Sequence, residues 1–273
     1  MKITLQQVWI SAFLIIASLV AAFPLLWMLS MSFMPEAEAN AFPARLFPHD
    51  PTLANYAELF AHQRMGRFLF NSLLIASLAT VLSLAFNVTA GYAFAKLHFR
   101  GREKLFQFLL AVVVIPGQLT MLPLFFQLKT LGLLNSYAGV VVPFMASLFG
   151  IFLVRQYALG LPDEMLQAAR VDGASEWQIF RRIVLPNLSP IIVTLGVFTF
   201  LTAWNDFLWP LIVLSDDHNY TLPLAIASLS QEHIQDSGMV MACATVTIAP
   251  VILLFLALQR HYVRGLLAGS VKG

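Results

Sequence analysis

Long apolar stretches dominate the chain, and short polar segments separate them. A helix crosses the hydrocarbon core of a bilayer with about 20 mostly apolar residues, and lipid requires that backbone polar groups be satisfied within the segment. Six stretches meet this length, and they do not show the alternating pattern of a membrane β-strand. They cover residues 8–33, 68–95, 105–127, 137–154, 189–213 and 239–258. The pattern predicts an all-α integral membrane protein, with six transmembrane helices in a single transmembrane domain over residues 1–273.

The first stretch has two interpretations, because Lys2 followed by an apolar run also describes a secretory signal peptide. The apolar core of a signal peptide is usually about 7–15 residues long. No charged residue occurs here between Lys2 and Glu36, a much longer interval. We therefore expect this stretch to be retained as the first transmembrane helix.

The distribution of Lys and Arg predicts the orientation, because these residues accumulate in cytoplasmic segments. With a cytoplasmic N-terminus, twelve of the sixteen fall inside and four fall outside. The four outer ones are Arg45, Arg64, Arg67 and Lys129. The outer loop at 214–238 has no basic residue and contains only acids among its charged residues. We therefore expect both termini to face the cytoplasm.

Composition supports the membrane assignment and excludes several other classes. Hydrophobic residues make up 59% of the chain and charged residues 11%, whereas a soluble domain carries about 25% charged residues. Disordered chains are poor in apolar residues, so they are excluded too. The single cysteine, Cys243, excludes a disulfide framework. A net charge of +2 without a concentrated basic patch argues against nucleic-acid binding.

Motifs for catalysis and for cofactor binding are absent from the sequence. There is no Gly-x-x-x-x-Gly-Lys-Ser/Thr phosphate loop, so the chain is not expected to hydrolyse ATP. There is no Gly-x-Ser-x-Gly nucleophile elbow, and the six histidines are scattered without ligand-like spacing. We therefore expect a non-enzymatic protein with no metal and no cofactor of its own.

Polar residues within the apolar stretches are the candidates for a translocation pathway. Small and polar residues recur on one helical face of the second stretch, and this face favours either close helix packing or a polar lining. Asp206 is the only carboxylate within an apolar stretch. It is either a solvated residue at a helix end or a buried group that contacts the substrate. The tryptophan beside it suits a membrane interface or sugar stacking. The candidate pathway residues are Asn87, Trp204, Asn205 and Asp206.

Prolines interrupt the apolar stretches. Each one removes a backbone donor and tends to kink its helix, which membranes tolerate where neighbouring groups satisfy the backbone. Broken helices suit a protein that opens and closes a pathway, but proline is also common in membrane spans, and both interpretations stay open. The seven prolines concerned are Pro24, Pro116, Pro123, Pro143, Pro190, Pro210 and Pro250.

The most polar cytoplasmic segment is the loop at residues 155–186, between the fourth and fifth stretches. Pro162-Asp163-Glu164 is typical of a helix start, and we expect this helix to end near Val171. Gly173 follows as a stop signal. A second short helix is predicted over Ser175–Ile183 with Ser175 as its cap. The loop is therefore either a polar connector or a docking element built from two short helices around a glycine corner.

This loop resembles the "EAA" signature of ABC importer permeases. The matching residues are Gln167-Ala168-Ala169, then Gly173 after three residues, and then Ile183-x-Leu185-Pro186 after nine more. The resemblance extends to the carbohydrate-uptake branch. Its further supports are residues 51–56, Asn71-Ser72, residues 91–96, Trp204-Asn205-Asp206, residues 221–223 and residues 265–273. The chain is similar to the smaller, six-span partner of a maltose-type or glycerol-3-phosphate-type permease pair, with the type I importer permease fold.

The resemblance implies a partner assembly in a bacterial inner membrane. The loop would dock on a cytoplasmic ATPase, so that closure of the ATPase dimer on ATP switches the permease from inward- to outward-facing. The implied partners are a second permease subunit in a heterodimer, two copies of the ATPase, an extracytoplasmic solute-binding protein and membrane lipid. ATP and Mg²⁺ would bind to the ATPase and not to this chain.

The coupling role implied by the resemblance falls on a defined set of residues. They are Glu164, Gln167, Ala168, Ala169, Asp172, Gly173, Ile183, Leu185 and Pro186. One departure is that Gln167 stands where the family has a glutamate, which leaves a neutral and weaker hydrogen bond unless Glu164 supplies the charge. The C-terminal tail would also reach toward the ATPase, or it is simply a solvated positive tail. Its candidate contacts are Arg264, Lys272 and Gly273.

Three other classes of membrane protein remain as alternatives. A secondary transporter working without an ATPase needs a coupling-ion site at mid-membrane, whereas the apolar stretches contain only one carboxylate, Asp206, near a helix end. A membrane enzyme needs a catalytic cluster, which the sequence lacks. A purely structural subunit leaves the loop signature without an explanation.

Overall fold

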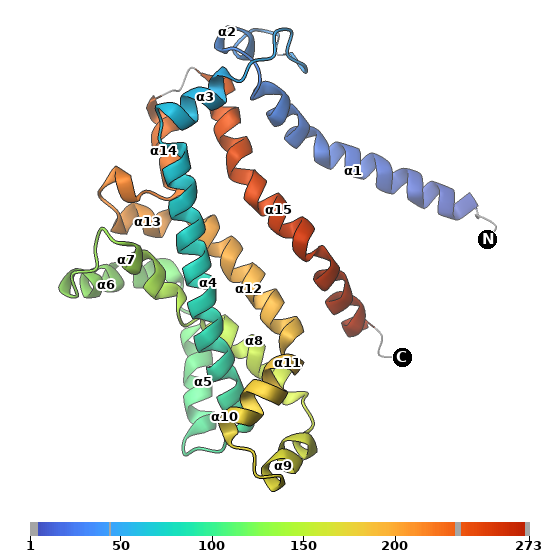
Figure 1. Ribbon diagram of the computed structural model, residues 1–273, viewed down its shortest axis with the longest axis vertical. Coiled ribbons are helices and arrows are strands. Elements are labelled where there is room, and N and C mark those ends of the chain that lie inside the picture. Colours follow the sequence, from blue (N-terminus) through green and yellow to red (C-terminus); the bar gives the residue numbers. More distant parts are fainter. Residues whose placement is uncertain (1–4, 44, 233–235, 271–273) are drawn as a thin grey trace. The chain divides into compact units, whose positions relative to one another are not determined.

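The computed structural model describes residues 5–43, 45–232 and 236–270, and every regular element in those ranges is a helix (Figure 1). The expectation of an all-α protein is confirmed. The chain divides into two compact units. The first comprises the chain up to Arg67 together with Ala225–Leu253, and the second comprises Phe68–Leu224 together with the residues from Leu254 onward.

Four helical segments are long and apolar enough to cross a membrane by themselves. They are Gln6–Met31, Met65–Lys96, Tyr137–Leu159 and Ser237–Ala257. Two helix pairs pass the same test only if each is taken as one broken span. These pairs are Arg102–Val112 with Gly117–Thr130, bent by 104°, and Glu176–Asn187 with Ser189–Trp204, bent by 76°. The described residues therefore provide between four and six spans.

The first unit is built around the turn that follows its long first helix. Its elements are α1 (Leu5–Met31), α2 (Glu36–Ala39), α3 (Ala54–Ala61), most of α14 (Leu222–Glu232) and the first part of α15 (Ser237–Ser270). The buried side chain of Asn55 donates hydrogen bonds to the main-chain oxygens of Ser32 (3.0 Å) and Met34 (2.9 Å). Ser32 also bonds the hydroxyl of Tyr56 at 2.7 Å. These bonds hold α3 against the end of α1.

The second unit contains the loop that the sequence singles out. Its elements are α4 (Met65–Lys96), α5 (Arg102–Val112), α6 (Gly117–Thr130), α7 (Tyr137–Val141), η1 (Val142–Phe144), α8 (Leu148–Leu159), α9 (Asp163–Val171), α10 (Glu176–Ile179), the π-helical turn η2 (Phe180–Val184), α11 (Leu185–Asn187), α12 (Ser189–Trp204), α13 (Leu208–Val213) and η3 (Asp217–Asn219). One apolar core joins α4, α8, α9, α10, η2 and α12. Its buried members include Val88, Val154, Leu166, Ile179, Val184 and Leu195.

Glycines allow α4 and α8 to pack closely. A Cβ atom on Gly91 of α4 would come within 2.6 Å of Val154, and one on Gly150 of α8 would come within 2.7 Å of the Asn87 amide. Asn87 is fully buried and uses both ends of its amide in this contact. It donates to Ser83 Oγ at 2.7 Å, and its Oδ1 accepts from the backbone N–H of Ser147 at 2.9 Å. Each helix therefore fills the space left by a glycine of the other.

Proline accounts for the break in the third apolar stretch. α5 ends at Val112 and α6 begins at Gly117, with Pro116 between them in an extended conformation. A residue that precedes proline is disfavoured in the helical conformation, so Ile115 cannot easily continue α5. The fifth stretch also breaks, because α12 ends at Trp204 and α13 starts at Leu208. The fourth stretch is divided as well, into α7, η1 and α8, so three of the expected continuous helices consist of shorter elements.

Candidate functional site

The loop at residues 155–186 forms a corner of two short helices, as its residues predict. α9 starts after Pro162, and α10 starts after Ser175, whose side chain forms a capping box with Gln178. The second helix differs from the prediction, because α10 ends at Ile179 and continues as the π-helical turn η2. Gly173 lies between the two helices with a φ of +82°. The corner is therefore formed by a residue in the left-handed conformation that glycine favours.

The two faces of α9 differ in their surroundings. Leu166 and Ala169 are buried in the core of the second unit. Glu164, Gln167 and Ala168 are exposed and lie on one helical stripe, because they are three and four residues apart. Of the remaining candidate coupling residues, Asp172, Gly173 and Pro186 are exposed, while Ile183 and Leu185 are half-buried against the core. The structure therefore places part of the predicted set on the surface and part beneath it.

Lys96, the last residue of α4, ties that helix to the start of α9. Its side chain is 6% exposed. The ammonium group donates to Asp163 Oδ1 and to the main-chain oxygen of Leu161, each at 2.6 Å. This hydrogen bond and the lysine charge lower the pKa of the Asp163 carboxyl below its ordinary value of 3.8. The stabilising charge of Asp163 is thus present above that value and is lost only as the pH falls through the lowered pKa.

Tyr92, one turn before Lys96 in α4, reaches the other side of the corner. Its hydroxyl donates to Glu176 Oε2 at 3.3 Å. Glu176 begins α10 and also receives two bonds from the guanidinium of Arg170 in α9, at 2.6 and 3.4 Å. The corner is therefore clamped across its two helices and attached to α4 at two points (Figure 1), where α9 and α10 lie beside the C-terminal end of α4.

The candidate pathway residues do not gather into one cluster. Asn87 lies in the contact between α4 and α8. Trp204 is 1% exposed and stacks on Phe200 with 5.8 Å between the ring centroids, and its indole N–H is buried without a partner among the described residues. Asn205 is exposed and bonds the backbone of its own helix. Asp206 is half-buried and accepts a 3.4 Å bond from the backbone N–H of Trp209.

The loop after α13 is held by polar side chains. Asn71 of α4 donates to the main-chain oxygens of His218 and Tyr220, each at 2.9 Å, and accepts a 2.7 Å bond from the Tyr137 hydroxyl. The backbone N–H of Leu222 donates to Ser72 Oγ at 2.6 Å. The pair Asn71-Ser72 therefore fixes the loop that leads into α14.

We expect Asn71→Leu to destabilise the loop after α13. The change removes both donors to the loop and the acceptor of Tyr137, and a buried polar group left unpaired costs about 1–3 kcal/mol. The measurement is thermal unfolding of the purified complex, together with the rate of limited proteolysis within residues 214–221. Asn187→Leu is the control, because Asn187 is exposed and bonds only to the backbone of Ile183. Equal stability of the two variants would show that Asn71 does not stabilise this loop.

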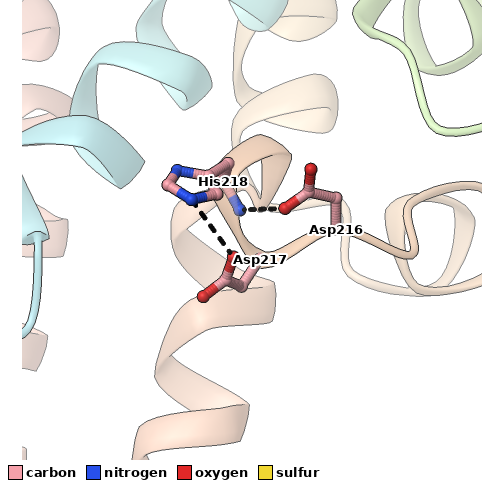
Figure 2. Close-up of side chains that lie close together, drawn as sticks. All are labelled: Asp216, Asp217 and His218. Carbon is pink, nitrogen blue, oxygen red and sulfur yellow. Dashed lines mark hydrogen bonds and ion pairs between the residues drawn. The ribbon is translucent and has the colours of Figure 1, made fainter.

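Three side chains in the same loop lie close together at η3, as Figure 2 shows. The ligand-capable atoms of Asp216, Asp217 and His218 all lie within 4.8 Å of one another. The backbone N–H of His218 donates to Asp216 Oδ1 at 2.9 Å, which makes Asp216 the cap of η3. Capping therefore accounts for the position of Asp216, and no metal is assigned to this group.

The predicted tail contacts fall at the edge of the structure. Arg264 belongs to α15, and its side chain is not described. Lys272 and Gly273 lie outside the described residues. Their contact with an ATPase remains a prediction.

Four residues at the corner were not identified from the sequence as functional. Val171 of α9 and Trp177 of α10 are exposed apolar residues, with 87% and 65% of their surface accessible. Tyr92 and Lys96 were noted only within a segment that resembles the family. The sequence feature that could have indicated Lys96 is its position as a lysine at the end of a long apolar stretch. Its partner Asp163 is distant in sequence and is revealed only by the fold.

Comparisons with known proteins agree with this architecture. Residues 87–267 match the family described as "Binding-protein-dependent transport system inner membrane component". The chain is 38% identical to an arabinooligosaccharide transport system permease protein of Halalkalibacterium halodurans, covering 93% of this chain and 92% of that protein. It is 34% identical to a lactose transport system permease protein of Rhizobium radiobacter, covering 94% and 93%.

A solved structure shows the same fold. A chain of a bacterial ABC transporter involved in the import of the acidic polysaccharide alginate superimposes with a TM-score of 0.82, at 23% identity and over 93% of this chain and 95% of that chain. The chain therefore belongs to the family of binding-protein-dependent transport system inner-membrane components. It is a multi-pass, non-catalytic permease subunit, and the resemblance seen in the sequence is confirmed.

Proposed function

We propose that this chain is the permease subunit of an ATP-binding-cassette importer that carries a carbohydrate into the bacterial cytoplasm. The observation that carries the proposal is the cytoplasmic corner of α9 and α10, which exposes one face and is attached to a membrane-spanning helix through Lys96 and Tyr92. The names of the relatives supply the substrate class, since they transport arabinooligosaccharides and lactose. A transporter without an ATPase is not favoured, because the family is binding-protein-dependent.

Three sets of residues at the corner have different parts in coupling. Glu164, Gln167 and Ala168 face the ATPase, with the charge of Glu164 replacing the one that Gln167 lacks. Asp172 and Gly173 shape the turn between the helices. The residues that join the corner to the body of the subunit are Ala169, Ile183, Leu185 and Pro186. ATP and Mg²⁺ bind to the partner ATPase, and this chain contributes only a docking surface.

The complete importer contains a second permease subunit, two ATPase copies and a solute-binding protein. The twelve-to-four distribution of Lys and Arg supports six spans with both termini in the cytoplasm. A structural neighbour with a TM-score of 0.61 is an alginate ABC transporter in complex with a periplasmic protein, which supports docking of such a protein at the outer face. Arg264, Lys272 and Gly273 then lie on the ATPase side, and Asn87 and the segment Trp204–Asp206 lie along the pathway.

Purification of the tagged chain from its native cell in mild detergent tests the assembly. Mass spectrometry of the co-purifying proteins is expected to identify an ATPase with a phosphate-binding loop and a second permease. Uptake of a labelled sugar by the purified complex in proteoliposomes, with ATP inside, then tests the substrate class. A well-folded chain recovered alone under several gentle conditions, with uptake that needs no ATP, would contradict the proposal.

We expect Ala168→Tyr to weaken docking of the ATPase. Ala168 is exposed on the outer stripe of α9, so a larger side chain does not disturb the core but does separate the two subunits. A steric clash that costs about 1.4 kcal/mol lowers affinity tenfold, and we expect the recovered ATPase to fall by about that factor. Ala168→Ser is the control, because it stays small. Equal recovery with both variants would show that this face does not contact the ATPase.

A further inference from the structure

A cleft of about 300 Å³ lies between α4, the η1–α8 segment and α12 in the second unit. Its volume is at the lower end of the range of about 300–1,000 Å³ for small-molecule sites. Hydroxyl groups and aromatic rings line it together. The hydroxyls are those of Ser83, Ser147, Thr199 and Thr202, and the rings are those of Phe144, Phe149 and Phe198.

The cleft lies well inside the apolar length of its helices. Ser83 is 13 residues before the end of α4 at Lys96, which is about 20 Å along a helix that rises 1.5 Å per residue. Thr199 is 10 residues after the start of α12 at Ser189, or about 15 Å. Polar groups at such depth are costly unless they have a partner, so a hydroxyl there that lacks one requires an explanation.

The hydrogen bonds of α12 set Thr199 apart from its neighbours. Thr194 and Thr202 donate to the main-chain oxygens of Pro190 and Phe198, at 2.9 and 2.8 Å, as threonine commonly does within a helix. The Thr199 hydroxyl has no partner in the part of the chain that the structure describes. Ser83 is fully buried, and its oxygen accepts from Asn87. The cleft therefore presents the unused hydroxyl of Thr199 beside aromatic rings.

We infer that this cleft contacts the rings of an uncharged carbohydrate during its passage through the membrane, an inference that rests on the proposed function. A sugar ring carries hydroxyl groups at its edge and C–H groups on its faces. The hydroxyl groups suit Thr199, and the C–H groups suit the negative faces of aromatic rings such as Phe198. No charged side chain is among the lining residues. A phosphorylated or acidic sugar would lack a charge partner here, which is costly away from water.

Transport by the reconstituted complex tests the inference. The complex is placed in proteoliposomes with ATP and its binding protein, and labelled lactose, arabinotriose and diacetylchitobiose serve as neutral probes, with an alginate trisaccharide as the acidic probe. Thr199→Val keeps the shape of the side chain and removes the hydroxyl. We expect uptake of the transported neutral probe to fall by about threefold to tenfold, the range that corresponds to one hydrogen bond. Recovery of the ATPase subunit should be unchanged.

Two variants separate a sugar contact from a general defect. Thr199→Ser restores the hydroxyl and should restore uptake. Thr194→Val should transport like the wild type, because the hydroxyl it removes bonds only to its own helix. Wild-type uptake by Thr199→Val, or preference of the wild-type complex for the acidic probe, would overturn the role of the cleft and leave the importer function intact. Failure of the wild-type complex to move any of the four probes would instead refute the proposed carbohydrate function.

Discussion

Replacing Lys96 by methionine is expected to stop ATP-driven uptake while the subunit stays in the membrane. Methionine keeps most of the aliphatic length of lysine, so the packing at the end of α4 is largely preserved. The ammonium group is lost, and with it the 2.6 Å bonds to Asp163 and to the main-chain oxygen of Leu161. The Asp163 carboxylate is exposed and can be solvated instead, so the loss falls on the link between the two helices. The start of α9 would then lose its bonds to α4, and movement of the corner would no longer be passed on through Lys96.

The measurement is uptake of labelled sugar by proteoliposomes that contain the complex, compared with ATP hydrolysis by the same preparation. We expect uptake to fall at least tenfold. This factor corresponds to a weakening of the contact between α9 and α4 by about 1.4 kcal/mol. Basal hydrolysis should persist, since the ATP site is on the partner subunit. Lys104→Met is the matched control, because Lys104 is exposed near the same end of α4. Coupled uptake by Lys96→Met would show that the contact between Lys96 and Asp163 does not transmit the motion.

Replacing Gly173 by valine is expected to have a comparable effect for a different reason. The position has a φ of +82°, and a Cβ atom there would meet nothing within 4 Å. The cost is therefore conformational and not steric. A left-handed conformation costs an L-residue roughly 1–2 kcal/mol, and a β-branched residue such as valine tolerates it least. Relief of this strain would change the angle between α9 and α10 and misplace the docking face.

Gly173→Asn provides the control for this prediction, since asparagine adopts the left-handed conformation more readily than other non-glycine residues. We expect uptake to fall at least tenfold with valine and to stay within about threefold of the wild type with asparagine. Membrane levels of both variants, measured by immunoblot, should equal the wild type. Similar activity of the valine and asparagine variants would mean that the backbone conformation at Gly173 does not control coupling.

The sequence predicts the parts of this fold that depend on local patterns. The apolar stretches become helices because each is long and continuous enough to satisfy its own backbone. The corner was predicted from Pro162, Gly173 and Ser175, because helix starts, stops and caps are determined by the residues at those positions. The cap by Ser175 and the left-handed conformation of Gly173 are observed as expected.

Features that depend on contacts between distant residues were not predictable in this way. Nothing near Lys96 in the sequence indicates that it bonds Asp163, because the two residues meet only after α8 has packed against α4. The different surroundings of Ala168 and Ala169 were not predictable for the same reason. These neighbours look equivalent in the signature, yet one is exposed and the other is buried in the core. The bend at Pro116 was expected as a kink, but its size of 104° depends on how α5 and α6 pack.

The close contact between α4 and α8 limits the ways in which this subunit can change shape. Gly91 accommodates Val154, and Gly150 accommodates Asn87, so sliding or rolling of either helix would drive a side chain into the backbone of the other. The two helices are thus expected to move as one rigid body during the transport cycle. Spin labels attached to the outer faces of α4 and α8 should keep a constant separation with and without ATP, and the flexible joints of the transporter must then lie elsewhere.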